Sequence, residues 1–373
     1  MNVIIEARAL SATSGGVKSY THELITHLLA LRSQDSFEVI YGSENITGLF
    51  PSVKETVLPL SSELLLPYWL SARVGQYVKM QKPTVVHYTK AAIPLRSTGI
   101  PTVVTIYDII PEFLPETQSF LRRMYWPAVL RHASNHADHI ITISEQSKKD
   151  IIQQYQISED KITVTPLAVN ASHFYPRPKS NTAKPYILFV GTRDQRKNIS
   201  SLIRSFAALS KEIPHQLVIA GKSAHKNDES KQIVQELSIQ NRVEFREYIP
   251  YEDLPQLYSD ADLFVWPSVY EGWGFPPQEA MACGTPVIVS DGGSLPEVVG
   301  DAGIVVPFST SNLHMRMNDT SFIELLTARM REVLEDTALA EKLRSRGLLQ
   351  SKKFSWQGVA EKTRDVYRHI SDL

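Results

Sequence analysis

The sequence predicts an α/β protein of two domains, each a parallel sheet flanked by helices. Short apolar runs that suit buried strands alternate along the chain with longer stretches that suit helices. A chain of 373 residues is also longer than one ordinary hydrophobic core requires. A polar stretch with several prolines predicts a linker over 173–185, so we expect one domain over 1–172 and another over 186–354.

Composition excludes several classes of function. The formal net charge is −1, so overall charge favours neither nucleic acid nor an anionic membrane as a partner. Cys283 is the single cysteine, which rules out an intramolecular disulfide and fits a reducing, cytoplasmic compartment. Met1 leads straight into a predicted strand rather than a signal peptide, and no apolar run is long enough to span a bilayer.

The first half opens with a strand over 3–5 and a glycine pair, Gly15 and Gly16, that starts a helix ending near Leu31. A glycine loop at a helix start can approach a phosphate or sugar closely, although Gly-Gly also makes ordinary turns. Further strands are expected over the following ranges: 37–41, 84–88, 102–107, 140–143 and 162–165. For the aromatic, Leu-rich stretch over 63–80 we expect a packed helix, with a membrane-surface helix as the alternative.

Polar residues stand at the ends of two first-half strands. His87 lies at the end of one, and Tyr107 and Asp108 follow another. Ligands of open α/β sheets bind beyond the carboxyl ends of the strands, so these residues are candidates for a ligand site. A lone histidine in a strand is about as often a satisfied core residue, and His87 keeps that alternative.

The second half begins with a strand over 186–191 followed by a basic loop. Arg193, Arg196 and Lys197 occupy this loop before a helix that starts near Ile199. Cations at the carboxyl end of a strand, next to a helix start, suit a phosphate, whereas a run of charges elsewhere is usually only solvated. The strand alternation then continues over 217–220, 243–246, 263–266, 287–289 and 303–306, with late helices over 322–334 and 339–349.

A glycine loop between two of these strands carries two carboxylates. Glu271 precedes Gly272 and Gly274, and Pro276 begins a helix that should hold Glu279 in its first turn and end at Gly284. A helix N-terminus suits an anion, and a carboxylate there can accept hydrogen bonds from a ribose diol. The simpler alternative is that Glu279 only complements the helix dipole and Glu271 is solvated.

The run Glu-Gly-Trp-Gly-Phe-Pro-Pro-Gln-Glu at 271–279 resembles the Glu-x7-Glu motif of the retaining glycosyltransferases of family 4. That resemblance implies the GT-B fold, two Rossmann-like domains facing a central cleft, with a terminal helix over 355–373 that packs back on the first domain. Ser355 as N-cap and Trp356 as anchor suit that helix. Nearly the whole chain is covered, the second domain more densely than the first.

The resemblance also implies residue roles. As catalytic residues it gives Glu271, Lys197, Arg196 and Asp108, and as acceptor-side residues His87 and Tyr107. The donor-binding residues that it implies are Gly15, Gly16, Arg193, Gly221, Lys222, Gly272, Trp273, Gly274, Phe275, Glu279, Ser294 and Leu295. Many relatives carry a histidine where this chain has Tyr107, so a role copied from that histidine does not transfer.

The implied reaction moves a hexosyl group from a nucleotide sugar, with GDP-mannose as the best match, to a saccharide or lipid-linked acceptor. UDP- and ADP-sugars stay open as donors, as does contact with the inner face of a membrane. Two rivals remain: a nucleotide-sugar 2-epimerase of similar fold, and a non-catalytic nucleotide-sugar-binding subunit. No nucleic-acid partner is expected.

No cofactor and no metal is expected for this reaction. His132 and His136 are spaced for one helix face, but no glutamate fills the general-base position of a His-Glu-x-x-His motif. Asp260 and Asp262 formally make an Asp-x-Asp, yet hard cations need more converging carboxylates, so we expect a structural role.

Overall fold

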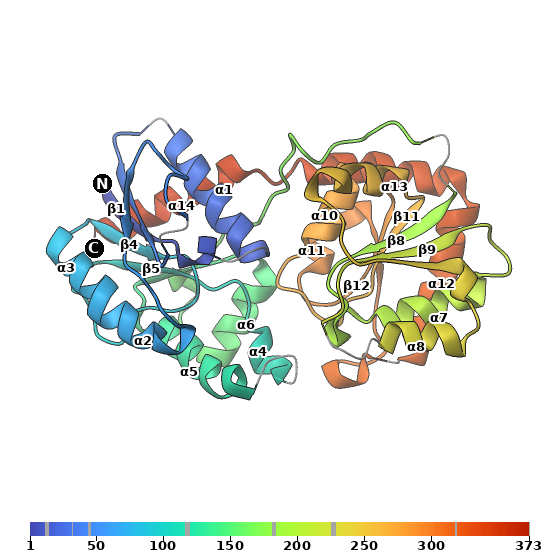
Figure 1. Ribbon diagram of the computed structural model, residues 1–373, viewed down its shortest axis with the longest axis horizontal. Coiled ribbons are helices and arrows are strands. Elements are labelled where there is room, and N and C mark those ends of the chain that lie inside the picture. Colours follow the sequence, from blue (N-terminus) through green and yellow to red (C-terminus); the bar gives the residue numbers. More distant parts are fainter. Residues whose placement is uncertain are drawn as a thin grey trace. The chain divides into compact units, whose positions relative to one another are not determined.

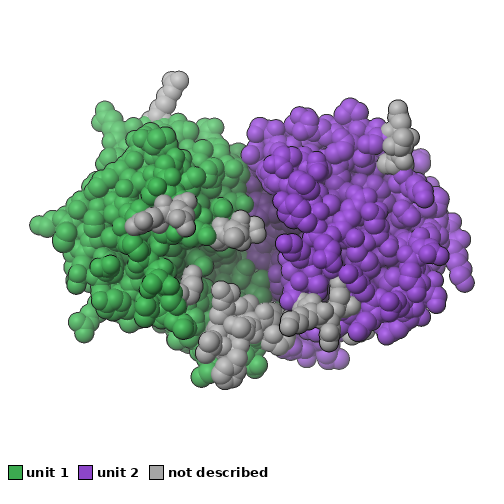
Figure 2. All heavy atoms as spheres, viewed as in Figure 1, with its two compact units in different colours: residues 1–167, 355–373 green, residues 168–354 purple. Residues whose placement is uncertain are grey.

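The computed structural model describes residues 1–11, 15–31, 33–43, 46–115, 120–180, 184–224, 229–317 and 319–372. Contacts divide the chain into two compact units, coloured separately in Figure 2: unit 1 contains residues 1–167 and 355–373, and unit 2 contains residues 168–354. Residues 181–183 of the expected linker, and Leu373 of the expected last helix, lie outside the described residues.

Unit 1 is built on a seven-stranded, wholly parallel sheet in the order β3-β2-β1-β4-β5-β6-β7 (Figure 1). Its strands are β1 (Asn2–Glu6), β2 (Ser36–Tyr41), β3 (Lys54–Val57), β4 (Val85–Tyr88), β5 (Thr102–Thr105), β6 (His139–Thr142) and β7 (Ile162–Val164). The central strands are buried on both faces, which explains why they consist of almost continuous apolar runs. The half-buried β3, Lys-Glu-Thr-Val, lacks such a run, and it was not predicted.

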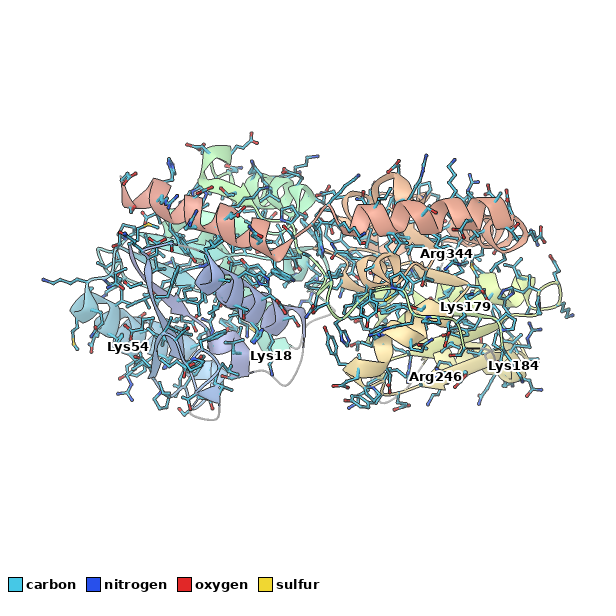
Figure 3. The ribbon with its side chains drawn as sticks, turned by 90° about the horizontal axis from the view of Figure 1, so that it is seen from above. Lys18, Lys54, Lys179, Lys184, Arg246 and Arg344 are labelled. Atoms are coloured by element: carbon cyan, nitrogen blue, oxygen red, sulfur yellow. The ribbon has the colours of Figure 1, made fainter. Side chains whose placement is uncertain are left out.

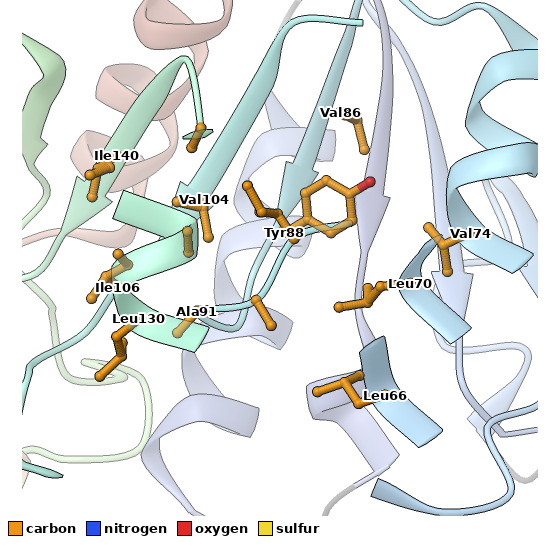
Figure 4. Packing of buried hydrophobic residues seen from close by; sticks show 14 of the residues in the cluster. Leu66, Leu70, Val74, Val86, Tyr88, Ala91, Val104, Ile106, Leu130 and Ile140 are labelled. Atoms are coloured by element: carbon orange, nitrogen blue, oxygen red, sulfur yellow. The ribbon is translucent and has the colours of Figure 1, made fainter. Parts of the chain in front are cut away.

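The helices of unit 1 connect these strands. They are α1 (Gly16–Ala30), α2 (Leu66–Tyr68), α3 (Gly75–Gln81), α4 (Ile110–Phe113), α5 (Phe120–His136), α6 (Glu145–Tyr155) and α14 (Trp356–Ser371). The stretch predicted as one helix over 63–80 is broken: a π-helical segment, Trp69–Val74, separates α2 from α3. Trp69 and Leu70 of that segment are buried in the hydrophobic core of unit 1, which Figure 4 shows around Tyr88 and Val104.

The last helix, α14, belongs to unit 1 although its sequence follows unit 2. Ser355 caps it by accepting a hydrogen bond from the backbone N–H of Gly358 at 3.1 Å. Trp356, in its first turn, is buried 6.1 Å from the ring of Tyr20 on α1. The helix packs along α1 and also contacts β4 and β6, so it covers one face of the first sheet.

Unit 2 repeats the architecture with a six-stranded parallel sheet in the order β10-β9-β8-β11-β12-β13. Its strands are β8 (Tyr186–Val190), β9 (Gln216–Ala220), β10 (Val243–Arg246), β11 (Leu263–Trp266), β12 (Val287–Ser290) and β13 (Ile304–Val306). Its helices are α7 (Ile199–Leu209), α8 (Glu229–Glu236), α9 (Leu254–Asp260), α10 (Phe275–Ala282), α11 (Leu295–Val299), α12 (Thr320–Glu335) and α13 (Thr337–Ser351). The predicted α/β class with parallel sheets is confirmed.

Each sheet has one switch point, where the chain stops adding strands on one side and begins to add them on the other. In unit 2 the chain builds outward from β8 to β9 and β10, and then returns to lay β11 on the other side of β8. The loops that leave β8 and β11 therefore emerge at the switch point of the sheet, at the carboxyl ends of two neighbouring strands, where ligands of such sheets bind. Within the part of the chain described, no helix is long and apolar enough to cross a membrane.

Candidate active site

The loops at the switch point of unit 2 bring the basic loop and the carboxylate loop together. Arg196 and Lys197 follow β8, and Glu271 follows β11, the neighbouring strand. The carbonyl of Arg196 accepts hydrogen bonds from Ser268 Oγ at 3.0 Å and from the backbone N–H of Val269 at 2.8 Å. These two bonds fix one loop against the other, so the three charged side chains occupy one place.

Glu271 is the centre of this cluster. Lys197 Nζ donates to Glu271 Oε1 at 2.5 Å, and Arg196 Nη1 donates to Glu271 Oε2 at 2.7 Å. The indole N–H of Trp266, the last residue of β11, lies 3.2 Å from Oε1. Only 11% of the Glu271 side chain and 12% of the Lys197 side chain are exposed. We call Glu271, Arg196 and Lys197 the charged triad.

The electrostatics of the triad follow from burial and charge pairing. Burial alone would raise the pKa of Glu271, but the charges of Arg196 and Lys197 outweigh it and lower that pKa to about 2. Burial lowers the pKa of Lys197 below its ordinary value, and Glu271 opposes that shift. A carboxylate and two cations are thus held charged in a partly desolvated site, where an incoming phosphate can compete with Glu271 for both cations.

A third loop, the one that follows β12, supports Glu271. The Glu271 backbone pairs with Gly293 in a parallel bridge, and the Glu271 carbonyl accepts hydrogen bonds from the N–H and the hydroxyl of Ser294 at 3.0 and 3.1 Å. Gly293 has a φ of +65°, and a Cβ there would lie 2.3 Å from that same carbonyl oxygen. Only glycine fits this close approach. Ser294 is fully buried, so its side chain orients Glu271 and does not face solvent.

Helix α10 begins one residue earlier than predicted, which moves Glu279 just out of its first turn. Helix α10 begins at Phe275, with prolines at its second and third positions, so Glu279 is its fifth residue and lies beyond the first turn. Gly284, with a φ of +76°, follows the helix end as predicted. Tyr258 Oη donates to Glu279 Oε2 at 2.7 Å, and burial raises the pKa of this carboxyl to about 7 despite that hydrogen bond. The helix N-terminus therefore does not hold this carboxylate directly.

Arg193 points away from the charged triad. It is buried, and its guanidinium donates to the carbonyl of Gly221 and lies 3.4 Å from Glu247. Gly221 has a φ of +134°, and a Cβ there would collide with the carbonyl of Gly191. Lys222 is exposed, with Nζ 5.9 Å from the ring centre of Tyr248. The structure thus gathers these predicted donor residues at the ends of β8 and β9, beside the triad and not in it.

Other motif residues are structural in this geometry. Trp273 is buried edge-on against Phe354, with its indole N–H 3.3 Å from Gln278 Oε1. Leu295 is fully buried, and a Cβ on Gly274 would lie 2.9 Å from its side chain. These residues hold the carboxylate loop against α11. Gly272 is buried in that loop, and Phe275 is half-buried at the start of α10.

His87, a predicted acceptor-side residue, is instead a core histidine. It is fully buried in unit 1, with Nδ1 2.7 Å from Tyr367 Oη and Nε2 2.8 Å from Thr105 Oγ1. Burial lowers its pKa to about 3, so it stays neutral. Both ring nitrogens are hydrogen-bonded inside the core of unit 1. The core alternative for this residue is therefore the correct one.

The remaining first-half candidates lie at the carboxyl edge of the unit 1 sheet. Tyr107 is half-buried, donates its hydroxyl to the carbonyl of Thr89 at 2.7 Å, and packs edge-on against Tyr20. Asp108 accepts the N–H of Ile110 at 3.1 Å. Gly15 and Gly16 are exposed at the start of α1, and Gly15 has a φ of +121° with open space around it.

The two weaker metal candidates are occupied by structural contacts. Asp262 pairs with Lys179 at 2.5 Å (Lys179 is labelled in Figure 3), and Asp260 accepts from the backbone N–H and hydroxyl of Ser180. His132 stacks on His136 with ring centres 4.4 Å apart. Among the described residues, no group of three or more acidic, histidine or cysteine side chains could hold a metal ion.

Three residues of the site were not predicted. Trp266 and Ser268 contact the triad, and Tyr258 contacts Glu279. Trp266 lies in an apolar run, and the sequence signals only a buried strand there. Tyr258 lies on α9, twenty-one residues before its partner, and no local pattern links the two. Such partners emerge only when the sheet order is known.

Two family models match consecutive parts of the chain. "Glycosyltransferase Family 4" matches residues 14–173, and "Glycosyl transferases group 1" matches residues 174–349. The match to the first model covers the expected acceptor-side domain, and the second includes both site loops. The chain is a family 4 glycosyltransferase. The carboxylates, cations and switch-point loops described above thus belong to an enzyme that transfers sugar groups.

Two curated relatives of this glycosyltransferase carry mannosyl names. The O-antigen chain mannosyltransferase B of Escherichia coli is 28% identical over 99% of the chain and 100% of its own length. The O-antigen chain mannosyltransferase RfbU of Salmonella typhimurium is 32% identical over 64% of each chain. Among solved structures, HepE of Anabaena in complex with UDP-glucose has a TM-score of 0.74 at 18% identity, covering 99% of this chain and 100% of its own. That likeness confirms the GT-B fold.

Proposed function

We propose that this glycosyltransferase transfers mannose from GDP-mannose to a saccharide or lipid-linked saccharide, with retention and without a metal ion. The mannosyl names of the two curated relatives support the sugar, and family 4 membership supports retention. The observation that carries the proposal is the charged triad at the switch point of unit 2, where two cations and one carboxylate converge in a site poor in solvent.

The two cations suit the diphosphate of a nucleotide sugar. Arg196 and Lys197 would turn from Glu271 to the phosphate oxygens and stabilise the charge that builds on them as the sugar leaves. A divalent ion performs this task in many other transferases, and a fixed arginine and lysine supply the same positive charge here. Glu271, released from the cations, would accept hydrogen bonds from the hydroxyls of the transferring sugar.

The proposed transfer accounts for every bond and proton without a dedicated general base. The bond between the anomeric carbon and the diphosphate oxygen breaks, and a bond from that carbon to the acceptor oxygen forms on the same face. The proton of the acceptor hydroxyl passes to the departing diphosphate. Glu271, whose low pKa keeps it ionised, would steady the positive charge on the anomeric carbon. This route makes no demand for an imidazole at the position of Tyr107.

We assign the acceptor to unit 1, where Asp108 and Tyr107 lie at the carboxyl edge of the sheet. Glu279 in unit 2 would bind the ribose, because its carboxylate lies one helical turn beyond the start of α10 and is held by Tyr258. A cytoplasmic location agrees with the single, buried Cys283, which needs no oxidising compartment.

A donor panel tests the proposal. GDP-mannose, GDP-fucose, UDP-glucose, UDP-N-acetylglucosamine and ADP-glucose would each be mixed with the enzyme in EDTA. Thermal shift and slow release of free nucleotide would be recorded for wild type, Glu279→Ala, and the control Glu252→Ala, which changes an exposed carboxylate of the same unit. We expect GDP-mannose alone to stabilise strongly and to be cleaved, with Glu279→Ala defective and Glu252→Ala normal.

Each other outcome has a definite meaning. Stabilisation by UDP- or ADP-sugars alone would show that GDP-mannose is not the donor, while the assignment as a transferase would stand. A donor that binds and is never cleaved, even with saccharide acceptors added, would indicate a binding subunit. Conversion of GDP-mannose to another GDP-hexose without an acceptor would indicate an epimerase. Activity that appears only when EDTA is replaced by a divalent cation would contradict metal independence.

A further inference from the structure

An apolar pocket lies in unit 1, whereas the charged triad belongs to unit 2. It has a volume of about 170 Å³ and is enclosed by three segments: α2 with the π-helical turn after it, the loop after β4, and α5. Its walls include Leu66, Leu70, Ile93, Leu95, Val129 and His132. His132 Nε2 is hydrogen-bonded to the carbonyl of Pro94 at 3.0 Å, so the one imidazole in the wall is already paired.

Large apolar side chains close in sequence to the lining residues are exposed. Leu64 is 75% exposed and Tyr68 65% exposed, both beside the α2 wall, and Met124 on α5 is 68% exposed. Leu95 lines the pocket and is itself 60% exposed, so the pocket opens to solvent there. Scattered exposed apolar residues are ordinary, but a set gathered around an apolar pocket marks a binding surface.

The charge of the same segments is strongly one-sided. Residues 62–74, 91–97 and 120–136 contain five arginines, no lysine and a single acidic residue, Glu63, in a chain whose overall net charge is −1. The arginines are Arg73, Arg96, Arg122, Arg123 and Arg131. Arg96 directly follows the pocket residue Leu95 and is exposed, and Arg73 is exposed on the π-helical turn that contributes Leu70. Arginine suits phosphate groups because its planar fork can donate two hydrogen bonds.

One wall of the pocket comes from a loop that starts at the carboxyl edge of the sheet. Ala92, Ile93 and Leu95 belong to the loop that leaves β4, and Asp108 belongs to the loop that leaves β5. These two strands are direct, parallel neighbours, so both loops emerge at the same carboxyl edge. The loop that lines the pocket therefore begins at the edge that holds the proposed acceptor residues.

We propose that this pocket binds the hydrocarbon chain of a lipid-linked acceptor, with its phosphate or diphosphate held by Arg96 and Arg73. The inference rests on the proposed function, because it selects the lipid-linked class among the acceptors left open there. The size fits: an apolar cavity of about 150 Å³ holds a benzene-sized group, so about one isoprene unit or a few methylenes enter. The exposed leucines and Tyr68 would cover the next part of the hydrocarbon chain.

Farnesyl diphosphate and inorganic diphosphate are suitable probes, because they share the anionic group and differ in the chain. Binding of each would be measured by calorimetry with GDP in excess, which keeps both probes out of the donor site. We expect farnesyl diphosphate to bind at least about tenfold more tightly, since each buried methylene adds measurably to affinity. Equal binding of the two probes would overturn the proposal.

Three variants locate the binding. Ala128→Phe fills the pocket from an exposed lining position of α5, and Leu95→Asp places a charge at its mouth. Each should weaken farnesyl diphosphate binding about tenfold, and Ala128→Phe, which adds no charge beside Arg96, should leave inorganic diphosphate binding unaffected. Leu349→Asp is the control, because Leu349 is an equally exposed leucine of unit 2. Wild-type affinity in both pocket variants would overturn the proposal, and circular dichroism would verify that each variant is folded.

Two further measurements distinguish the lipid pocket from a membrane-binding surface and from a defective donor site. Sedimentation with phosphatidylglycerol vesicles tests a membrane contact: vesicle binding that survives Ala128→Phe, without binding of monomeric farnesyl diphosphate, would overturn the proposal in favour of a bilayer surface. The GDP-mannose thermal shift reports on unit 2 alone. A normal shift without farnesyl binding refutes the lipid pocket and leaves the transferase intact, whereas no shift with any nucleotide sugar refutes the proposed function and the acceptor assignment with it.

Discussion

Lys197 Nζ lies 2.5 Å from Glu271 Oε1, although the two residues are 74 positions apart in the chain. The pair joins the loop after β8 to the loop after β11. These are the two neighbouring strands between which the order of strand addition reverses. Under the proposed function the Lys197 cation pairs with the donor diphosphate, so donor binding would exchange the Glu271 carboxylate for a phosphate and free Glu271 for the sugar.

The Glu271→Gln variant distinguishes the effect of Glu271 on GDP binding from its effect on turnover. In Glu271→Gln the cations lose their internal anion, so we expect GDP to bind at least as tightly as to wild type. We expect turnover to fall by about a hundredfold or more, since a preorganised charge contact is worth about 3 kcal/mol. Calorimetry with GDP and a steady-state transfer assay measure the two effects. Weaker GDP binding together with normal turnover would contradict the exchange.

Donor binding should depend on pH through Glu279. Burial raises the pKa of Glu279 to about 7, so this group is increasingly protonated below neutrality and loses its power to accept a ribose hydrogen bond. We expect donor affinity to fall by up to about tenfold per pH unit below pH 7. Glu279→Gln should bind donor weakly at every pH, and a wild-type profile in that variant would exclude Glu279 as the titrating group.

The same shift predicts a direction for stability. The folded protein keeps the Glu279 proton up to about pH 7, whereas the unfolded chain loses it near its ordinary value of 4.5. The unfolded state is therefore favoured as pH rises between these values, and Glu279 lowers stability over that window. Urea unfolding at several pH values should show Glu279→Gln gaining stability relative to wild type as pH rises from about 4.5 to 7. A constant difference would contradict the raised pKa.

Tyr107→Phe tests whether the hydroxyl that stands at the position of the family histidine takes part in the reaction. The hydroxyl of Tyr107 already donates to the carbonyl of Thr89 at 2.7 Å, and burial raises its pKa well above the ordinary value. We expect turnover to change by less than about threefold and stability to fall by about 1 kcal/mol, the usual worth of one hydrogen bond. A loss of turnover beyond about a hundredfold, with GDP binding intact, would show that the hydroxyl takes part in the reaction.

Trp273 should behave as a core residue despite its place in the motif. It is buried against Phe354, so Trp273→Ala is expected to cost about 3–5 kcal/mol of unfolding free energy. At a temperature where the variant is folded, its affinity for GDP should stay within a few-fold of wild type. Chemical denaturation and calorimetry measure the two quantities, and a stable variant with greatly weakened GDP binding would reverse the assignment.

Much of the fold could be predicted because strands buried on both faces leave continuous apolar runs. Strands β10 and β11 begin and end at the predicted residues, and Ser355 caps its helix as expected. The edge strand β3 was missed because its Lys-Glu-Thr-Val sequence faces neighbours on one side only. The π-helical break at 69–74 has no local signal, since it depends on packing Trp69 and Leu70 into the core.

The site was predictable only as far as its motifs are local. Glu271, Arg196 and Lys197 could be proposed from their loops, but their mutual pairing depends on which strands are adjacent. The packing of the last helix decides the environment of His87, because Tyr367 of that helix, 280 residues away, hydrogen-bonds to it inside the core. A residue at the end of a strand can face a ligand or a helix, and the sequence of that strand is the same in both cases.

The measurement that tests the central claim most directly is the turnover of Lys197→Ala with GDP-mannose, compared with Lys231→Ala. Lys231 makes an exposed ion pair with Glu247 in the same unit, worth at most about 1 kcal/mol. If Lys197 stabilises the departing diphosphate, its loss should lower turnover by about a hundredfold to a thousandfold, corresponding to about 2.7–4 kcal/mol, while Lys231→Ala stays near wild type. Equal turnover in the two variants would contradict the assignment of the charged triad to the donor.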